Sequence, residues 1–421
     1  MAHASHVVRL GHPGEFRPVP LSVRRALGAV LLACALLAGC AGGSSSSAPV
    51  TLALWSHGGT PAERAALAAS VAAFHTAHPQ VSVAVHDVSE GDYTTQLQEA
   101  VAEHRVPDVV DVDGPLVASF AAQGALAPLD HLLAASTLAN TTPTLRAQGT
   151  WRSRFWALGQ FDSGLGIWAD RAALRRAGVR VPTGVADAWS ASEFADALRR
   201  LSAHDPDRKV LDLKLDYGEG EWLTYGFAPL VASAGGDVGQ LGSDAVLTVL
   251  QDLARWRPYV DPDTDGKAFV SRRVPLSWAG HWVYADYRRA LGSDLVLLPL
   301  PDLGHGSRTG SGSWAWAIGA QSHHAKAAAQ LLQWFVQDSE VRRMTAANGA
   351  LPGTVSALKA SDLASPGDPL HLYVEQREAG AAVPRPVTPT YPTLTATFAH
   401  AVHAVLTGTA PGQAWKQAAG G

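Results

Sequence analysis

A chain of 421 residues is two to three times as long as a typical domain. With 47% hydrophobic residues it can bury a large core, so a multi-lobed globular protein is expected and a disordered one is excluded. Only 17% of residues are charged and the formal net charge is −4, so the sequence offers no basic patch for nucleic acid. Both cysteines, Cys34 and Cys40, lie near the N-terminus, which leaves the rest of the chain without a disulfide, a thiolate metal site or a cysteine nucleophile.

The N-terminus has the layout of a signal peptide over residues 1–39. Arg24 and Arg25 precede an apolar run of 14 residues, 26–39. This run is too short to cross a bilayer of about 30 Å as a permanent helix. Removal of the segment from the mature protein is therefore expected.

The tetrad Leu37-Ala38-Gly39-Cys40 resembles a bacterial lipobox, in which the cysteine is lipidated and becomes the first residue of the mature protein. We expect Cys40 to carry a lipid anchor that holds the protein on the extracytoplasmic face of the cell membrane. Residues 40–49 then comprise the lipidated cysteine and a Gly- and Ser-rich segment, which is expected to act as a flexible tether.

Predicted strands and helices alternate from residue 50 onward. Hydrophobic periodicity predicts strands at 50–55, 81–88 and 109–112, and helices at 61–77, 93–103 and 116–123. This β-α-β-α-β order favours a mainly parallel sheet with helices on its faces.

The alternation continues along the rest of the chain. A pair of strands is expected within 155–168, and later elements are helices at 171–177 and 191–203, strands at 295–298 and 314–318, and helices at 325–337, 341–347 and 394–406. No internal repeat and no second linker is visible, so two lobes would have to share the chain rather than follow one another.

Several segments occur in a distinctive order. They are 50–130, 155–164 (FWALGQFDSG), 234–237 (AGGD), 278–284 (WAGHWVY), 310–319 and 349–352 (GALP). In this order they resemble the family of bacterial extracellular solute-binding proteins that serve ABC importers for sugars, over nearly all of residues 50–421.

The resemblance implies an α/β fold, a two-lobed periplasmic-binding-protein-like clamp. Each lobe is expected to be a mainly parallel sheet flanked by helices, with the chain crossing between the lobes several times. Carrying the crossings over gives lobe one as 50–160 plus 312–340, and lobe two as 161–311 plus 341–421. A ligand would lie in the cleft between the lobes.

The implied function is that of an extracytoplasmic receptor of an ABC importer. It would be a monomer that binds a sugar, of di- or oligosaccharide size, and delivers it to the permease subunits. Neither enzyme activity nor a cofactor is expected.

A sugar has a flat, partly apolar face and a rim of hydroxyls, so its site needs an aromatic plate and polar side chains. Trp282 is the first candidate for the plate. Trp314 is the second, although Trp316 would lie on the same side of the strand and one of the two could belong to the core. The other candidates lie at predicted strand ends and crossings: Trp55, His57, Asp111, Asp113, Gln160, Asp162, Gly312, Arg385 and Tyr391.

Two other functions stay open. The same fold could bind a polyamine or another small polar solute, with Asp111, Asp113 and Asp162 as acidic groups. A secreted glycoside hydrolase would also combine carboxylates with aromatic plates. No metal is expected, because the calcium-loop-like segment that begins at Asp261 has Arg272 at its twelfth position instead of glutamate.

Overall fold

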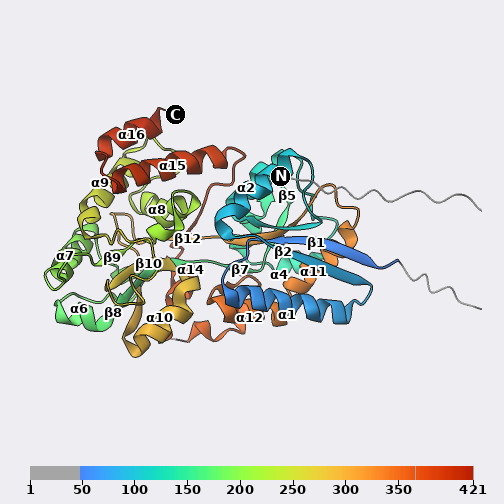
Figure 1. The fold of residues 1–421 in the computed structure, drawn as a ribbon, viewed down its shortest axis with the longest axis horizontal. Helices are drawn as coiled ribbons and strands as arrows, with labels where there is room; N and C mark the ends of the chain where they lie inside the picture. Colours follow the sequence, from blue (N-terminus) through green and yellow to red (C-terminus); the bar gives the residue numbers. More distant parts are fainter. Residues whose placement is uncertain (1–47, 366, 421) are drawn as a thin grey trace, which may run out of the picture. The chain divides into compact units, whose positions relative to one another are not determined.

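The computed structural model describes residues 48–365 and 367–420. The predicted signal peptide and Cys40 lie outside these residues. No helix of the described part is both long and apolar enough to cross a membrane. Figure 1 shows that its helices and strands gather around two separate sheets.

The first sheet has five strands in the order β2-β1-β3-β13-β6. β1 pairs in parallel with β2 and β3, whereas β13 runs antiparallel between β3 and β6. One strand, β13, therefore opposes the other four. The bounds are β1 (Val50–Ser56), β2 (Val81–Asp87), β3 (Val109–Asp113), β6 (Ala157–Gly159) and β13 (Trp314–Ile318).

Helices cover both faces of the first sheet. α1 begins at a capping box in which the Thr60 hydroxyl accepts the Glu63 N–H and the Glu63 carboxylate accepts the Thr60 N–H. It shares one apolar core with α11 and α12, while α2 and α3 enclose the other. The elements around this sheet are α1 (Pro61–Ala77), α2 (Glu90–Ala102), α3 (Val117–Ala122), α4 (Ala135–Asn140), α5 (Pro143–Gln148), β4 (Thr150–Trp151), β5 (Arg154–Phe155), α11 (Ala325–Phe335), α12 (Asp338–Asn348) and α13 (Val355–Lys359).

The second sheet has four strands in the order β11-β8-β10-β9. β8 runs antiparallel to β11 and β10, and β10 is parallel to β9, so again one strand opposes the rest. The bounds are β8 (Leu165–Asp170), β9 (Leu211–Asp212), β10 (Leu276–Gly280) and β11 (Leu295–Leu298).

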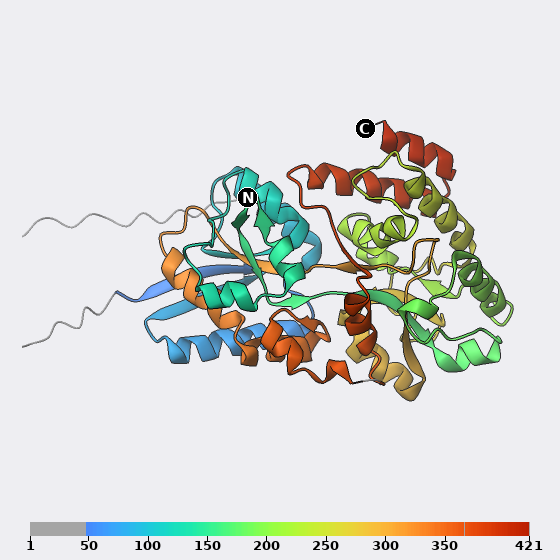
Figure 2. The ribbon, with the colours of Figure 1, turned by 180° about the vertical axis from the view of Figure 1, so that it is seen from behind.

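Helices also flank the second sheet, and the C-terminal α15 and α16 pack on α8 and α9 (Figure 2). α7 shows the sequence logic: Phe194, Ala197, Leu198 and Leu201 form one buried face at helical spacing. The helices are α6 (Arg171–Arg176), α7 (Ala191–Ser202), α8 (Glu221–Ser233), α9 (Asp244–Trp256), α10 (Tyr284–Leu291), α14 (His371–Glu378), α15 (Tyr391–Leu406) and α16 (Pro411–Ala419). Two one-turn 3₁₀ helices, η3 (Leu215–Tyr217) and η5 (His281–Val283), contribute to the site.

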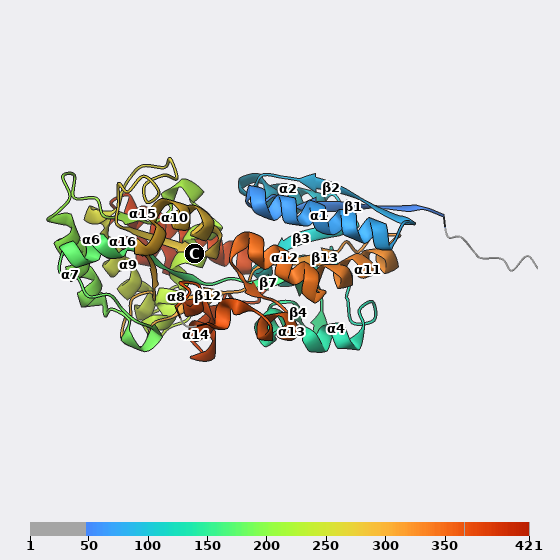
Figure 3. The ribbon, with the colours of Figure 1, turned by 90° about the horizontal axis from the view of Figure 1, so that it is seen from below.

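The chain passes between the sheets through short extended segments that pair with one another (Figure 3). β7 (Phe161–Asp162), on the way from β6 to β8, pairs with β14 (Leu351–Pro352). β12 (Thr309–Ser311), on the way from β11 to β13, pairs with β15 (Ala382–Pro384). Functional side chains near these crossings can therefore contact both sheets.

The predicted two-lobed α/β fold is confirmed. The strand expected at 50–55 and the helix expected at 61–77 are present as β1 and α1. Two long helices, α8 and α9, were not predicted. α8 lacks an amphipathic pattern because it is buried on nearly all sides, and Pro229 inside it is a residue that normally disfavours a helix.

The division into lobes by residue number stays a prediction. It ends lobe one at 340, whereas Val341, Met344, Ala350 and Ala357 pack in the core between the first sheet, α1 and α11. We propose that the last boundary lies after residue 357.

Candidate functional site

At the carboxyl edge of the first sheet, aromatic and acidic side chains contact one another. Nδ1 of His57, just after β1, hydrogen-bonds to Oδ2 of Asp111 in β3. The His57 ring lies flat on the Trp314 ring, with centroids 4.0 Å apart and planes 3° from parallel. Tyr93 packs edge-on against Trp314, and its hydroxyl accepts the Asp111 N–H and donates to the Trp55 carbonyl. These contacts fix the position of the Trp314 indole.

The two tryptophans of β13 differ in accessibility. Trp314 is half-buried, whereas Trp316 is 5% exposed and packs against Phe335. A pocket of about 20 Å³ beside both of them has room for one water molecule and none for a sugar ring. Burial raises the pKa of Asp111 in the wall of this pocket, and the neighbouring His57 opposes the shift. Trp314 is therefore the tryptophan of this strand that a ligand can reach.

A single arginine joins the two lobes. Arg385 follows β15, and its guanidinium donates to both oxygens of the Asp113 carboxylate at 2.7 and 2.8 Å and to Glu221 at 2.6 Å. Asp113 ends β3 of the first sheet, and Glu221 begins α8 beside the second. Tyr391 donates its hydroxyl to Glu221, and the guanidinium lies over the Tyr225 ring, 4.7 Å from its centroid. We call Asp113, Glu221 and Arg385 the inter-lobe ion cluster.

Asp113 and Arg385 are buried and Glu221 is partly buried, and the charges of this cluster affect the pKa values of Glu221 and Arg385. Burial raises the pKa of Glu221, while the positive charge of Arg385 opposes that shift. Burial alone would lower the pKa of Arg385, but Asp113 and Glu221 raise it well above its ordinary value. The guanidinium therefore stays charged and holds both carboxylates.

Aromatic rings of the second lobe contact this cluster. Trp282, in η5, donates its indole N–H to the Tyr217 hydroxyl at 2.9 Å. Its ring centroid lies 6.1 Å from that of Trp222 and 6.3 Å from that of Tyr225. Because Tyr225 also packs against Arg385, side-chain contacts lead from the ion cluster to Trp282.

Three of the predicted site residues, Asp162, Gln160 and Gly312, take part in hydrogen bonds to the backbone at the crossings between the lobes. The Asp162 carboxylate accepts the Gly312 N–H at 2.7 Å. Gly312 has φ +90°, and a Cβ there would lie 2.2 Å from Oε1 of Gln148, so the position requires glycine. Gln148 in turn makes two hydrogen bonds to the Ser313 backbone. The Gln160 amide donates to two backbone carbonyls of the first lobe.

His281 lies at another contact between the lobes. Its Nε2 hydrogen-bonds to the Ser163 hydroxyl at 3.0 Å and its Nδ1 to the Asn348 carbonyl at 2.7 Å. The Asn348 side chain donates to Glu63 in α1. Burial lowers the pKa of His281 below 6.5, although the Asn348 carbonyl and Glu63 oppose the shift.

This burial predicts a pH effect on stability. Because the folded pKa of His281 lies below the unfolded value, the unfolded chain binds the proton first on acidification, and the free energy of unfolding falls. We expect His281→Gln to abolish this contribution, so that between about pH 7.5 and pH 5.5 the wild type loses up to about 1.4 kcal/mol more than the variant. Urea unfolding at both pH values measures the difference. The control His323→Gln, at an exposed position, should lose as much free energy of unfolding between the two pH values as the wild type. Equal losses in the wild type, His281→Gln and His323→Gln would contradict the expectation.

No metal site emerges from the described residues, in which no group of three or more His, Cys, Asp or Glu side chains could hold an ion. In the calcium-loop-like segment, Arg273 pairs with Asp261 at 2.8 Å and with Asp265 at 2.9 Å. A guanidinium thus neutralises those carboxylates.

The structure brings the predicted residues together in separate groups. Trp55, His57, Asp111 and Trp314 form the first-sheet group, and Asp113, Arg385 and Tyr391 meet at the ion cluster. Their contacts with a ligand stay predictions. Sequence reasoning missed Glu221, Tyr225 and Tyr217, all within 217–225. The density of aromatic residues in that segment was the available signal.

Known proteins resemble this chain in sequence and in fold. A family model described as bacterial extracellular solute-binding protein matches residues 58–341. An uncharacterized lipoprotein in the oleD 5′ region of Streptomyces antibioticus is 26% identical over 352 residues, which are 77% of this chain and 75% of that protein.

Two solved structures are similar in fold. The GacH receptor of Streptomyces glaucescens GLA.O, known unliganded and in complex with acarbose and an acarbose homolog, has a TM-score of 0.76 and 22% identity over 89% of this chain and 97% of its own. The cyclic alpha-maltosyl-1,6-maltose binding protein from Arthrobacter globiformis has a TM-score of 0.71 and 22% identity over 88% of this chain and 97% of its own.

Proposed function

This chain belongs to the bacterial extracellular solute-binding protein family, whose model covers more than half of it, and we propose that its ligand is a sugar. The sugar, of di- or oligosaccharide size, would bind between the lobes and be delivered to the permease of an ABC importer. The family consists of binding proteins rather than enzymes, in agreement with the sequence prediction.

The observation that carries the proposal is the pairing of accessible indoles with a buried ion cluster between them. Trp314 lies opposite Asp113 in the strand pair β13–β3, and Asp113 is bonded to Arg385. From Arg385, contacts continue through Tyr225 to Trp282 in the second lobe. Aromatic faces flanking charged hydrogen-bonding groups match the apolar face and hydroxyl rim of a sugar. Two proteins of similar fold support this choice: GacH is known in complex with acarbose, and the Arthrobacter protein is described as binding cyclic alpha-maltosyl-1,6-maltose.

A polyamine fits the charges less well. A polycation needs carboxylates without a protein partner, yet Asp113 and Glu221 share Arg385, and Asp111 is bonded to His57. Asp162 accepts a backbone N–H. The carboxylates at the proposed site are therefore already compensated by protein groups.

A glycoside hydrolase fits the same carboxylates poorly. Retaining and inverting enzymes need one carboxylate free to act as nucleophile or base and one that is protonated to act as acid. Here Asp113 and Glu221 bind one permanently charged guanidinium. This arrangement supports binding rather than bond cleavage.

Thermal unfolding with candidate ligands tests the proposal. We expect at least one of maltotriose, acarbose and cyclic alpha-maltosyl-1,6-maltose to stabilise the protein by about 2.7 kcal/mol at a hundredfold excess over its dissociation constant, or roughly 3–4 °C in melting temperature for a chain of this length. Spermidine is the control and should leave the melting temperature unchanged. Stabilisation by spermidine and by none of the sugars would reverse the assignment, and release of nitrophenol from a chromogenic glycoside would favour the hydrolase.

We also propose that Cys40 anchors the protein to the extracytoplasmic face of the cell membrane. The lipobox-like tetrad supports this, and so does the description of the Streptomyces antibioticus relative as a lipoprotein. Nine residues separate Cys40 from β1, which begins at Val50. From its Gly- and Ser-rich composition, a segment of that length is expected to span roughly 15–18 Å, so the clamp would stay close to the membrane and to the permease.

A further inference from the structure

Tyr217 is unusual among the aromatic residues of this protein. Of the Phe, Tyr and Trp residues that the structure describes, it is the one with an exposed side chain, at 42%. Tyrosine and tryptophan side chains are enriched among the residues that contribute most to binding at interfaces. Its hydroxyl accepts the indole N–H of Trp282, the leading candidate for the sugar plate.

The exposed ring is nevertheless held in place on several sides. Trp222 contacts it edge-on, with centroids 5.2 Å apart. The ammonium of Lys214 lies 4.9 Å from the ring centroid, within the range of a cation–π interaction. Gly218, directly after Tyr217, has φ +79°, a conformation that favours glycine and ends the 3₁₀ turn. An exposed ring with a fixed orientation is pre-organised for a partner, because ordering it costs nothing further on binding.

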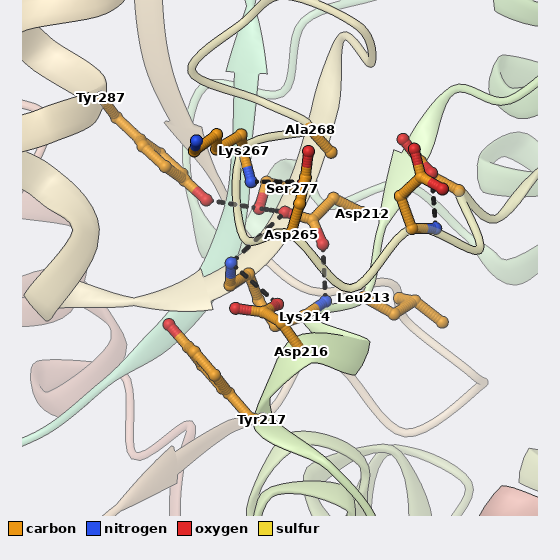
Figure 4. A network of polar contacts seen from close by, with 12 residues as sticks. Asp212, Leu213, Lys214, Asp216, Tyr217, Asp265, Lys267, Ala268, Ser277 and Tyr287 are labelled. Carbon is orange, nitrogen blue, oxygen red and sulfur yellow. Dashed lines mark hydrogen bonds and ion pairs between the residues drawn. The ribbon is translucent and has the colours of Figure 1, made fainter.

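Lys214 is the least expected part of this arrangement. It is 3% exposed and has φ +54°, which is strained for a residue other than glycine. Figure 4 shows its ammonium between the carboxylates of Asp212 and Asp216, at 3.9 and 3.0 Å, with Tyr217 beside them. Asp212 is fixed in turn by Ser277, whose hydroxyl donates to it at 2.9 Å. A buried ion pair of this kind is weak evidence for stability, but here its contacts hold the Lys214 ammonium beside the Tyr217 ring.

We infer that Tyr217 and Trp282 form one ligand-contacting surface, the aromatic ledge, and that Lys214 positions it. The inference rests on the proposed sugar-binding function. The Tyr217 hydroxyl orients the indole through the Trp282 N–H, and the exposed Tyr217 ring adds a second aromatic face next to it. A ledge of two rings suits a saccharide of two or more units, whose successive rings can stack on successive aromatic faces.

The positioning role can be tested without any ligand. The protein has 13 tryptophans, and the indole N–H resonance of Trp282 is the one lost in Trp282→Phe. We expect Tyr217→Phe to shift this resonance and to speed exchange of the Trp282 indole proton with solvent. The variant keeps the aromatic ring but removes the hydroxyl that accepts the indole N–H. Lys214→Met should also shift the Trp282 resonance. If that variant does not fold because Asp216 has lost its partner, the double variant Lys214→Met with Asp216→Asn removes the unpaired carboxylate and is measured instead. Tyr259→Phe, at a half-buried tyrosine of the same lobe, should leave it in place. An unmoved resonance in Tyr217→Phe would overturn the positioning role.

The contact role is tested by calorimetric titration with maltotriose, acarbose and cyclic alpha-maltosyl-1,6-maltose. Tyr217→Phe should weaken binding about 3–10-fold in the wild-type background and have no further effect in the Trp282→Phe background. Equal affinity of Tyr217→Phe and wild type, or independent effects of the two substitutions, would overturn the ledge. If none of the three sugars binds the wild type, the proposed function fails for them, and the indole resonance alone decides whether Tyr217 positions Trp282.

Discussion

Replacing Arg385 with methionine is expected to lower the free energy of unfolding by about 3–5 kcal/mol. The variant keeps the aliphatic stem but leaves the buried Asp113 and the partly buried Glu221 without their shared cation. Removing one partner of a buried ion pair costs more than removing the whole pair, because the remaining charge loses both water and its counter-ion. For a chain of this length, a loss of this size corresponds to roughly 4–6 °C in melting temperature.

Calorimetry and urea unfolding of the wild type and of Arg385→Met measure this loss. Arg289→Met is the matched control, because Arg289 pairs with Asp286 on the surface, where both side chains are mostly exposed, and its loss should stay below about 1 kcal/mol. Adding Asp113→Asn and Glu221→Gln to Arg385→Met should restore part of the stability by removing the unpaired charges. A melting temperature of Arg385→Met equal to that of the wild type would mean that the ion cluster does not hold the lobes together.

The parts of the fold that the sequence predicts best have local signals. α1 begins at Pro61 behind the Thr60–Glu63 capping box, and β1 and β3 are short apolar runs. The antiparallel strands β13 and β8 could be predicted as strands but not placed, since their pairing joins residues far apart in the chain. α8 gave no periodic signal, because nearly every side of it is buried.

The candidate site also combines contacts that the sequence can predict with contacts that it cannot. His57 and Asp111 could be predicted as neighbours, because both lie near the carboxyl ends of adjacent parallel strands. The sequence also predicts Asp113 and Arg385 as separate sugar contacts. Their bond to each other, across 272 positions, has no sequence signal. The bond gives Asp113 a role in stability in addition to its proposed role as an acceptor for sugar hydroxyls, whereas the residue pattern alone predicts only the second role.

Tyr217 illustrates a third kind of residue, whose role depends on a strained backbone. Nothing in the sequence around it indicates that Lys214 adopts a left-handed conformation. In this conformation the buried ammonium contacts both Asp216 and the Tyr217 ring. Only the three-dimensional arrangement makes an exposed tyrosine a candidate for binding.

Replacing Cys40 with serine is expected to release the protein from the membrane, with a fall of about tenfold or more in the membrane-bound fraction. Serine lacks the thiol that lipid attachment requires, and the 14-residue apolar run is too short to replace a lipid as a stable anchor. Burial of each methylene of an acyl chain contributes about 0.8 kcal/mol, so the anchor is strong only while the chains are attached.

Fractionation of cells that produce the protein decides this expectation, with the membrane pellet, the soluble fraction and the medium compared by immunoblot. Cys34→Ser is the matched control, because Cys34 lies within the apolar run and outside the lipobox-like tetrad. That variant should stay in the membrane pellet, since the attachment residue is intact. Retention of Cys40→Ser at the wild-type level would show that the protein is held by something other than a lipid on this cysteine. Release of both variants would instead indicate that the apolar run itself, and not Cys40, determines membrane attachment.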